Sequence, residues 1–418
     1  MKHLSIISLF LLSCLQMQAQ PVAIHIDTTT LRVENEVIPK DMEYELDRKL
    51  NDWQSRNYLV NDKECNSNGI NPTFADSVYI DRLSRIPSTI EMPFNSIIRK
   101  YIDVYAARNR EKVSFMLGAS NFYMPLFEQA LSAYNIPLEL RYLPIIESAL
   151  NPSAFSRAGA SGLWQFMIGT GKIYGLVSNT LIDERRDPIK STWAAAKYLK
   201  DLYSIYNDWT LVIAAYNCGP GNVNKAIRRT NGQKDYWAIY SHLPRETRGY
   251  VPAFVAANYI MTYYCKHNIC PLESQMPLDT DTLHIHKNLH FKQIAAICSI
   301  DIEEIKSLNP QYIKQIIPGN TQTCTLRLPR TAISTFIDAK ESVYNYQKEQ
   351  LFTRRKVVAI KKSFTKRSSS RAIRHKIKRG ESLSRIAQRY KVTTRQLKKW
   401  NHLKNSKIKA GKYLRIYK

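Results

Sequence analysis

The sequence predicts a mainly α-helical domain followed by two small α+β modules, each with the order strand, helix, helix, strand. Over residues 76–277 apolar residues recur at the spacing of a helix face. Prolines and glycines divide this stretch into separate helices. Beyond it, Ile285, Ile294, Ala295 and Asn309 match Ile377, Ile386, Ala387 and Asn401 at a constant offset of 92 residues. Such an offset indicates a repeated module, and each copy spans about 45 residues.

The first 19 residues have the pattern of an export signal. A short positive region precedes an apolar stretch from Leu4 to Leu15, and Ala19 is a small residue where cleavage is expected. Twelve residues are too few to span a bilayer, which takes about 18 or more. Acylation of Cys14 at a lipoprotein site is the second-ranked alternative, because Leu12 is bulky for such a site. We therefore expect a protein of the periplasm or cell envelope, membrane-associated if Cys14 carries a lipid.

Residues 20–75 are expected to be a loosely packed leader segment, since they are mixed in charge and rich in turn residues between Asn66 and Pro72. Six cysteines follow Cys14, and an even number outside the cytosol permits disulfides. Cys265 with Cys270, or Cys298 with Cys324, are the candidate pairs, and free buried thiols are an equal alternative. No Cys and His residues have zinc-ligand spacing, so we predict neither a metal nor a cofactor.

Three helices of the predicted helical domain can be placed in the sequence. Pro144 is placed in the first turn of a short helix that bears Glu147 and ends at Asn151 and Pro152. A second helix is expected over about residues 192–206. A third, over about residues 210–216, stops at the Gly219-Pro220-Gly221 turn.

Glu147 is the only carboxylate in an apolar run from Pro144 to Leu150. Burial in such a run disfavours the ionised form, so the side chain can hold a proton near neutral pH and act as a general acid. The simpler alternative is that Glu147 points to solvent from a buried helix.

Three other segments place amide, phenol and aromatic groups around such an acid: residues 158–167 (AGASGLWQFM), 214–221 (AAYNCGPG) and 246–252 (ETRGYVP). Aromatic rings stack on sugar faces and amides bind hydroxyl and acetamido groups, so this set is typical of a carbohydrate cleft. Taken singly, the aromatic residues could belong to the core and the glycines to turns.

In this order, the four segments resemble the lytic transglycosylase domain of glycoside hydrolase family 23. The resemblance is closer to the membrane-bound lytic murein transglycosylase D group and covers residues 76–277. It implies a lysozyme-like fold with Glu147 as the catalytic acid/base. It also implies that Ser148, Gln165, Tyr216, Asn217 and Tyr250 bind substrate or orient Glu147. Ile168 and Cys218 replace the usual proline and alanine beside two of the motifs, without removing a functional group.

The two repeats resemble LysM modules, which bind glycans that contain N-acetylglucosamine. The copy at residues 373–418 matches well, through Gly380 to Leu383 and Asn401. The copy at residues 280–330 is degenerate, because residues 288–291 replace the expected glycine and acid. Residues 331–350 could form a helix, within a segment from 331 to 372 that we expect to be a basic linker.

The resemblance implies cleavage of the β-1,4 bond between N-acetylmuramic acid and N-acetylglucosamine without water, forming 1,6-anhydromuramyl ends on peptidoglycan strands. Only one carboxylate is recognisable, whereas a conventional glycosidase uses two. A hydrolase on the same fold is the first alternative, and would need Asp183, Glu184 or Asp187 to position water. A non-catalytic scaffold that binds the wall is the second.

The charge of the chain is concentrated in its C-terminal tail. From Thr353 to Lys418 there are 24 Lys and Arg residues and one acid, Glu381, within a chain whose net charge is +26. In a cytosolic protein such a tail would indicate nucleic acid. An exported protein meets anionic lipid headgroups and wall carboxylates instead, so we expect these anionic surfaces as partners and no nucleic acid.

Overall fold

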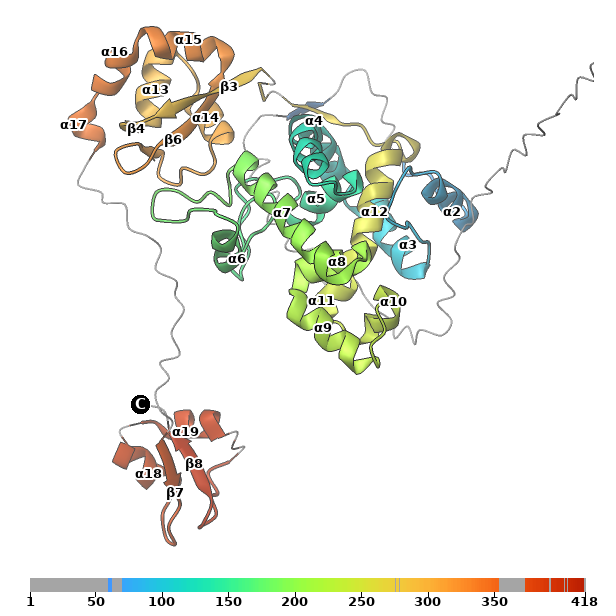
Figure 1. Ribbon diagram of the computed structural model, residues 1–418, viewed down its shortest axis with the longest axis vertical. Coiled ribbons are helices and arrows are strands. Elements are labelled where there is room, and N and C mark those ends of the chain that lie inside the picture. The colour runs from blue at the N-terminus through green and yellow to red at the C-terminus, as the bar shows by residue number, and fades with distance from the viewer. Residues whose placement is uncertain are drawn as a thin grey trace, which may run out of the picture. The chain divides into compact units, whose positions relative to one another are not determined.

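The computed structural model describes residues 59–61, 70–274, 276–277, 279–352, 373–390, 392–401, 403 and 405–416. The predicted signal peptide, Cys14, Cys65, most of the predicted leader and residues 353–372 lie outside the described residues. The described residues form two compact units, the first ending at residue 352 and the second beginning at residue 373 (Figure 1). Among the residues that the structure describes, no helix has the length and apolar character needed to cross a membrane.

The first unit opens with a helical domain, as the sequence predicts. Its helices are α2 (Asp76–Ser84), α3 (Ser96–Asp103), η2 (Val104–Arg108), α4 (Arg110–Ala133), η3 (Leu138–Tyr142), α5 (Leu143–Ser148), α6 (Ile168–Ile173), α7 (Pro188–Tyr206), α8 (Trp209–Cys218), α9 (Pro220–Arg229), α10 (Tyr236–Ile239), η4 (Tyr240–His242), α11 (Arg245–Arg248), α12 (Tyr250–Tyr263) and η5 (Tyr264–His267). Strand β1 (Leu59–Asn61) pairs antiparallel with β2 (Leu272–Ser274). Phe74 also packs against Tyr79 and His267, so the end of the predicted leader is part of this domain.

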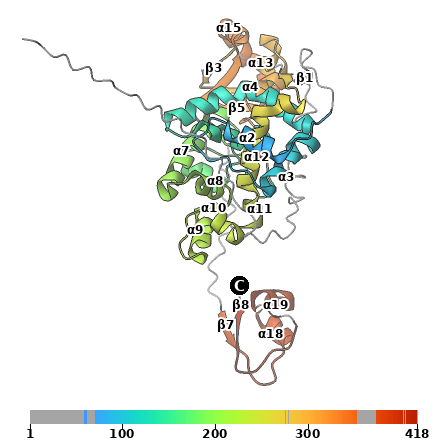
Figure 2. The same cartoon turned by 90° about the vertical axis from the view of Figure 1, so that its right-hand side faces the viewer.

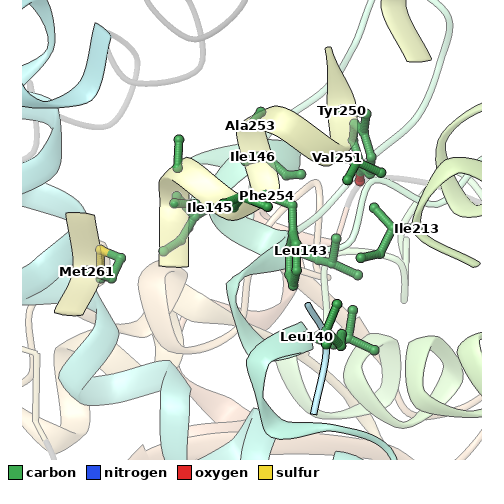
Figure 3. Packing of buried hydrophobic residues seen from close by; sticks show 14 of the residues in the cluster. Leu140, Leu143, Ile145, Ile146, Ile213, Tyr250, Val251, Ala253, Phe254 and Met261 are labelled. Atoms are coloured by element: carbon green, nitrogen blue, oxygen red, sulfur yellow. The ribbon is translucent and has the colours of Figure 1, made fainter. Parts of the chain in front are cut away.

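Helix α12 is the centre of the helical domain. Every residue from Tyr250 to Met261 is buried, and both overall views show the helix between α3 and α8 (Figures 1 and 2). The short helix α5 packs on α12 through Leu143, Ile145 and Ile146, near Phe254 (Figure 3). A helix that is apolar on all sides is stable only when neighbours enclose it. Helix α12 is therefore a fixed base for α5, which carries Glu147.

The predicted helices are present, with earlier starts than the apolar pattern indicates. Helix α7 begins at Pro188, where Asp187 accepts hydrogen bonds from the backbone N–H groups of Ile189 and Lys190. Helix α8 begins at Trp209, where Asp208 caps Leu211. Both helices begin directly after an aspartate N-cap. The N-cap therefore marks the start of each helix better than the first apolar residue does.

The first module follows the helical domain and contains the predicted order of strand, two helices and strand. Its elements are β3 (Thr280–Ile285), β4 (Asn288–His290), α13 (Phe291–Cys298), α14 (Ile302–Leu308), β5 (Ile316–Pro318) and β6 (Cys324–Pro329). Strand β3 pairs antiparallel with β6. The pair β4 and β5 is an addition that the repeat pattern does not indicate.

Residues 330–352 are folded onto the first module, which differs from the linker expected from residue 331. The expected single helix is divided into α15 (Arg330–Asp338), α16 (Lys340–Asn345) and α17 (Lys348–Leu351). Ala332, Phe336 and Val343 are buried in the core of the module. The side-chain amide of Gln293 donates to the carbonyls of residues 344 and 346, at 3.0 Å each. Apolar residues at helical spacing make this stretch part of the module's packing.

The second module is a compact unit with a hydrophobic core of its own. It contains β7 (Ile373–Lys376), α18 (Leu383–Tyr390), α19 (Thr394–Asn401) and β8 (Tyr413–Ile416), and β7 pairs antiparallel with β8. The core is formed by Ile377, Leu383, Ile386, Ala387, Leu397, Leu414 and Ile416. This is the order predicted for residues 373–418.

One asparagine makes the same clasp in both modules. Asn309 donates to the carbonyl of Arg327 at 2.7 Å and accepts from its N–H at 2.8 Å. Asn401 donates to the carbonyl of Arg415 at 2.8 Å and accepts from its N–H at 2.6 Å. Each amide thereby joins the end of the second helix to the closing strand. The sequence repeat therefore corresponds to a structural repeat.

The predicted disulfide pairs do not form. Cys265, Cys298 and Cys324 are free, as is Cys218, and Cys270 is disulfide-bonded to a cysteine other than these four. Cys298 and Cys324 are buried apolar side chains of the first module's core. The alternative of free thiols is therefore correct for these two residues.

Candidate functional site

Glu147 lies in the last turn of α5, at the only position of that helix that is not buried. The five other residues of the helix, from Leu143 to Ser148, are enclosed by the helical domain. Glu147 itself is half-buried, and its carboxylate accepts a hydrogen bond from the phenol of Tyr250. The side chain therefore does not extend freely into solvent, which was the simpler alternative.

Tyr250 is the first residue of α12, and its side chain is only 4% exposed (Figure 3). Burial, and then the neighbouring charge of Glu147, raise the pKa of Tyr250 well above its usual value. The phenol therefore stays protonated and keeps donating to Glu147. A Cβ atom on Gly249 would lie 1.9 Å from the Tyr101 hydroxyl oxygen, so a glycine is needed where α12 begins.

Tyr216 approaches the same carboxylate from α8. Burial, followed by the charge of Glu147, raises the pKa of Tyr216 well above its usual value. Its hydroxyl donates to the backbone carbonyl of Trp164 at 2.8 Å, which ties α8 to the loop that contains Gln165. The structure thus brings Glu147, Tyr216 and Tyr250 together from three helices.

Three non-glycine residues at the site have left-handed backbones: Ala149 (φ +52°), Leu150 (φ +60°) and Gln165 (φ +46°). Each such residue costs about 1–3 kcal/mol and persists only where the surroundings enforce it. The first two end α5 directly after Glu147 and Ser148, with the N–H of Ala149 donating to the carbonyl of Ile145. Strain of this kind is concentrated at functional sites.

Gln165 lies in a tight loop between residues 154 and 167. Its side-chain amide donates to the carbonyls of Gly162 at 2.8 Å and Ala154 at 3.3 Å, and the side chain is half-buried. Gly162 has a φ of +88°, and a Cβ atom there would lie 1.7 Å from the carbonyl oxygen of Arg185. The loop therefore rests directly on the backbone of residue 185.

Asn217 is exposed at the end of α8, and its side-chain oxygen accepts a hydrogen bond from the Thr247 hydroxyl at 2.8 Å. Thr247 is buried, so it fixes the orientation of the exposed amide. Sequence reasoning missed this role, although Thr247 lies within a quoted motif. A hydrogen bond across 30 residues leaves no periodic signal in the sequence.

Ser148, which the resemblance implied as a site residue, is fully buried. Its hydroxyl lies 3.0 Å from the carbonyl oxygen of Pro144 and 2.9 Å from that of Leu163. A side chain without exposed surface cannot contact a glycan. Ser148 instead joins α5 to the loop of Gln165, at Leu163. The half-buried or exposed candidates for substrate contact are Gln165, Tyr216 and Asn217.

The three candidates for a second catalytic carboxylate all have structural partners. Asp183 forms a buried ion pair with Arg185 at 2.7 Å. Burial alone would raise the pKa of Asp183, but its hydrogen bonds with Arg185 and Ser178 outweigh burial and lower it. Glu184 accepts from the N–H of Val177 and pairs with Lys190.

The third candidate, Asp187, is the N-cap of α7 and is buried. Burial raises its pKa. Within the described part of the chain, no group of three or more His, Cys, Asp and Glu side chains could hold a metal ion. Among the carboxylates singled out from the sequence, Glu147 is the one that the geometry leaves able to exchange a proton with a ligand.

Three protein families match separate parts of the chain. Residues 125–239 match the transglycosylase SLT domain. Residues 279–345 match the LysM-like domain of the lytic transglycosylase MltD. Residues 375–416 match the LysM domain. The order of these matches is the order predicted from the four motifs and the repeat.

The chain is also similar to several lytic murein transglycosylases. The chain is 29% identical to membrane-bound lytic murein transglycosylase D of Escherichia coli K12 over 330 residues, which cover 78% of this chain and 70% of the relative. It is 33% identical to the soluble lytic murein transglycosylase of the same organism over 34% of this chain and 23% of the relative. The crystal structure of the 70 kDa soluble lytic transglycosylase from Escherichia coli aligns with 36% of this chain and 26% of that chain, with 30% identity and a TM-score of 0.30.

Proposed function

Because this chain is a peptidoglycan lytic transglycosylase, with an SLT domain followed by two LysM-type modules, we propose that Glu147 is its single catalytic acid/base. The observation that carries the proposal is the half-buried carboxyl group of Glu147, which accepts a hydrogen bond from a buried phenol. The bond that we propose is cleaved is the β-1,4 linkage between N-acetylmuramic acid and N-acetylglucosamine.

One carboxyl group is sufficient if the substrate supplies its own nucleophile. Protonated Glu147 donates its proton to the glycosidic oxygen, and the bond from that oxygen to C1 of the muramyl sugar breaks. The resulting carboxylate then accepts the proton of the C6 hydroxyl of the same sugar, whose oxygen bonds to C1 and closes a 1,6-anhydro ring. Glu147 ends the cycle protonated, and no water is consumed. An intramolecular nucleophile gains from proximity and needs no second carboxylate.

The alternative of a hydrolase has no free carboxylate to use among the three named for it. Asp183 is held by Arg185, Glu184 by Lys190, and Asp187 by the N-terminus of α7. An inverting or retaining glycosidase needs its second carboxylate about 5–9.5 Å from the first and open to water or sugar. Because all three carboxylates are held by structural partners, ring closure is favoured over hydrolysis.

The surrounding polar groups have separate roles in this proposal. Tyr250 orients the carboxyl group of Glu147, while Tyr216 lies beside it and stabilises charge that develops on the reacting sugar. Gln165 and Asn217 bind hydroxyl or acetamido groups of the glycan. Ser148 positions Glu147 from within the core.

We propose that the LysM-type modules bind peptidoglycan and that the second module adds an electrostatic attraction to anionic lipid headgroups or wall polymers. We also propose that the chain is exported to the periplasm or cell envelope, with either cleavage after Ala19 or a lipid on Cys14. The intact mass of the mature protein distinguishes these two forms.

The proposal is tested with Glu147→Gln, compared with Glu246→Gln at an exposed position on α11. General acid/base catalysis contributes about 10²–10⁴-fold, so we expect Glu147→Gln to lose at least a hundredfold in kcat and to keep wall binding. The Glu246→Gln control should cleave normally. Mass spectrometry of the wild-type products should give muramyl ends lighter by one water than the reducing ends of a hydrolase.

Two results would contradict the proposal. Unchanged turnover in Glu147→Gln would remove Glu147 as the acid. Reducing muramyl ends from the wild-type protein would indicate a hydrolase.

A further inference from the structure

A hairpin of the helical domain inserts into the first module. We call residues 178–183 the docking hairpin; Ser178 pairs with Asp183 across it. Asn179 closes its turn, because the side-chain oxygen accepts from the N–H groups of residues 181 and 182 at 2.9 and 2.8 Å. Leu181 and Ile182 are buried at the tip, in the hydrophobic core of the first module.

The insertion is reciprocal. Leu308, at the end of α14 in the first module, is buried in the hydrophobic core of the helical domain. Each part therefore completes the core of the other. An exchange of buried side chains fixes two parts far more firmly than a flexible tether does.

Backbone and charge contacts reinforce the exchange. Ile182 pairs with Tyr312. The N–H of Asp183 donates to the carbonyl of Gln311 at 2.9 Å, and the N–H of Ile313 donates to the carbonyl of Leu181 at 3.0 Å.

Charges at the start of α7 also reach the module. Burial lowers the pKa of Arg327 on β6, and the carboxylate of Asp187 opposes that shift. The carboxylate of Asp187, at the start of α7, is thus close enough to Arg327 of the module to favour its charged form.

The docking hairpin also holds the loop of the active site. Asp183 binds the Arg185 guanidinium, which donates to the carbonyls of Gly159 at 2.7 Å and Phe166 at 2.9 Å. These two carbonyls lie on either side of Gln165. The main chain of Gly162 rests on the carbonyl of Arg185. Asp183 and Arg185 therefore connect the module to the loop that presents Gln165.

We propose that the first module is a positioning element of the catalytic site: by holding the docking hairpin, it keeps the loop of Gln165 in its reactive arrangement through Asp183 and Arg185. The kinetic part of this inference rests on the proposed function. Suppose instead that the first module only bound glycan. Undocking it from the docking hairpin would then weaken attachment to the wall and leave turnover of a short soluble substrate unchanged.

The test uses the full chain with Ile182→Asp and Leu308→Asp, one variant on each side of the exchange. Ile182→Ala is a milder variant that keeps the hairpin tip apolar, which matters if an aspartate prevents folding. Ile337→Asp is the matched control, because Ile337 is 57% exposed on α15 of the same module. The substrate is a short soluble oligomer of N-acetylmuramic acid and N-acetylglucosamine.

Hydrogen exchange supplies a readout that is independent of activity. Exchange at the amide of Ile313 reports docking, and exchange at Ser161 and Gly162 reports order in the loop, since the amides of these two residues donate to the carbonyls of Phe166 and Ala154.

We expect faster exchange at all three amides in the aspartate variants. We also expect kcat to fall roughly tenfold to a hundredfold, because small misplacements of a site cost that much. KM should rise as well, because the loop presents Gln165 to the glycan. Ile182→Ala should show a smaller effect in the same direction, and Ile337→Asp should behave like the wild-type protein.

The inference is overturned if the variants expose Ile313 to exchange while kcat and the loop amides stay at control values. It is also overturned if exchange at Ile313 is unchanged, because the buried side chains would then not hold the module. Failure of the proposed function is distinguishable: the wild-type protein would not cleave the oligomer, whereas the exchange measurements would still show whether docking orders the loop.

Discussion

At the scale of single residues, the phenol of Tyr250 donates a hydrogen bond that orients the carboxylate of Glu147. We expect Tyr250→Phe to lower kcat roughly tenfold to a hundredfold, the rate equivalent of a charge-assisted hydrogen bond of about 1.5–3 kcal/mol. KM should change little, because the buried ring remains in place. Steady-state kinetics on a soluble glycan oligomer measures both constants. The control is Tyr263→Phe on the same helix; equal kcat values for the two variants would contradict the assignment.

Two glycines in the Gln165 loop provide a matched pair. Gly159 and Gly162 have φ values of +92° and +88°, but a Cβ atom meets nothing within 4 Å at Gly159 and lies 1.7 Å from the Arg185 oxygen at Gly162. Alanine at either site carries a strain of about 1–3 kcal/mol. We expect Gly162→Ala to lower the free energy of unfolding further than Gly159→Ala and to reduce kcat more. Urea unfolding compares them, and equal losses would show that the clash relaxes.

The sequence alone identified the catalytic candidate and most of its neighbours, because each stands in a short motif. It could not separate Ser148, which is buried, from Gln165, which is half-exposed. Ser148 lies at a helix end set by the left-handed backbones of Ala149 and Leu150, and Gln165 has a left-handed backbone of its own. Nothing local in the sequence predicts these conformations. Arg185 was missed for a related reason, since its bonds reach back 19 and 26 residues.

At the scale of elements, a buried histidine joins the end of α12 to the segment that precedes α2. His267 is fully buried, lies 3.0 Å from the Tyr259 hydroxyl through Nε2 and 3.1 Å from the side-chain oxygen of Asn71 through Nδ1. Asn71 presents an acceptor, so we assign the proton to Nδ1, and Nε2 accepts from Tyr259. Burial, then the charges of nearby arginines, lower the pKa of His267 to about 4.

This depressed pKa predicts acid sensitivity of the helical domain. Between pH of about 6.5 and 4 the unfolded chain binds a proton that the folded chain does not, so the free energy of unfolding falls as the pH falls. The contribution is about 3 kcal/mol across that window. Urea unfolding at pH 7 and pH 5 should show a flatter pH dependence in His267→Gln. His242→Gln, at an exposed site, is the control. Parallel pH dependences in the wild-type protein and His267→Gln would disprove the claim.

The positions of helices and strands were predicted well where the apolar periodicity is strong. They were predicted poorly where a capping residue sets the end of a helix. The helix that bears Glu147 and both copies of the βααβ order follow from apolar spacing. That helix ends at Ser148, however, and not at Asn151 and Pro152, because Ala149 and Leu150 have left-handed backbones. Helices α7 and α8 start earlier than expected because Asp187 and Asp208 cap them. The three helices after residue 329 were expected in part as linker. The burial of α15 and α16 depends on contacts with α13, which is remote in sequence.

At the scale of the whole molecule, the second module has its own core and can be removed without opening the first unit. We expect deletion of residues 353–418 to weaken association with isolated sacculi, most strongly at low salt, where charge attraction is least screened. Turnover of a short soluble oligomer should be unchanged. Co-sedimentation at several salt concentrations measures the first effect. Unaffected binding would show that the second module is not an anchor.

The family and the order of domains were predictable because motifs and repeats are read along the chain. The docking of the first module was not. Leu181 and Ile182 look like any apolar pair in a loop, and their partners lie more than 100 residues away in the sequence. Non-local packing of this kind has no periodic signature, so only the folded structure shows which module is attached to the catalytic loop.

The shared asparagine clasp separates what the two modules have in common from what divides them. Asn309 and Asn401 fix the same interior, yet residues 280–329 carry five Lys and Arg against four acids, whereas residues 373–418 carry 16 against one. The surface charge of a module can therefore differ between the two copies while the asparagine clasp stays the same. We therefore expect salt concentration to tune attachment through the second module and to have little effect on the first.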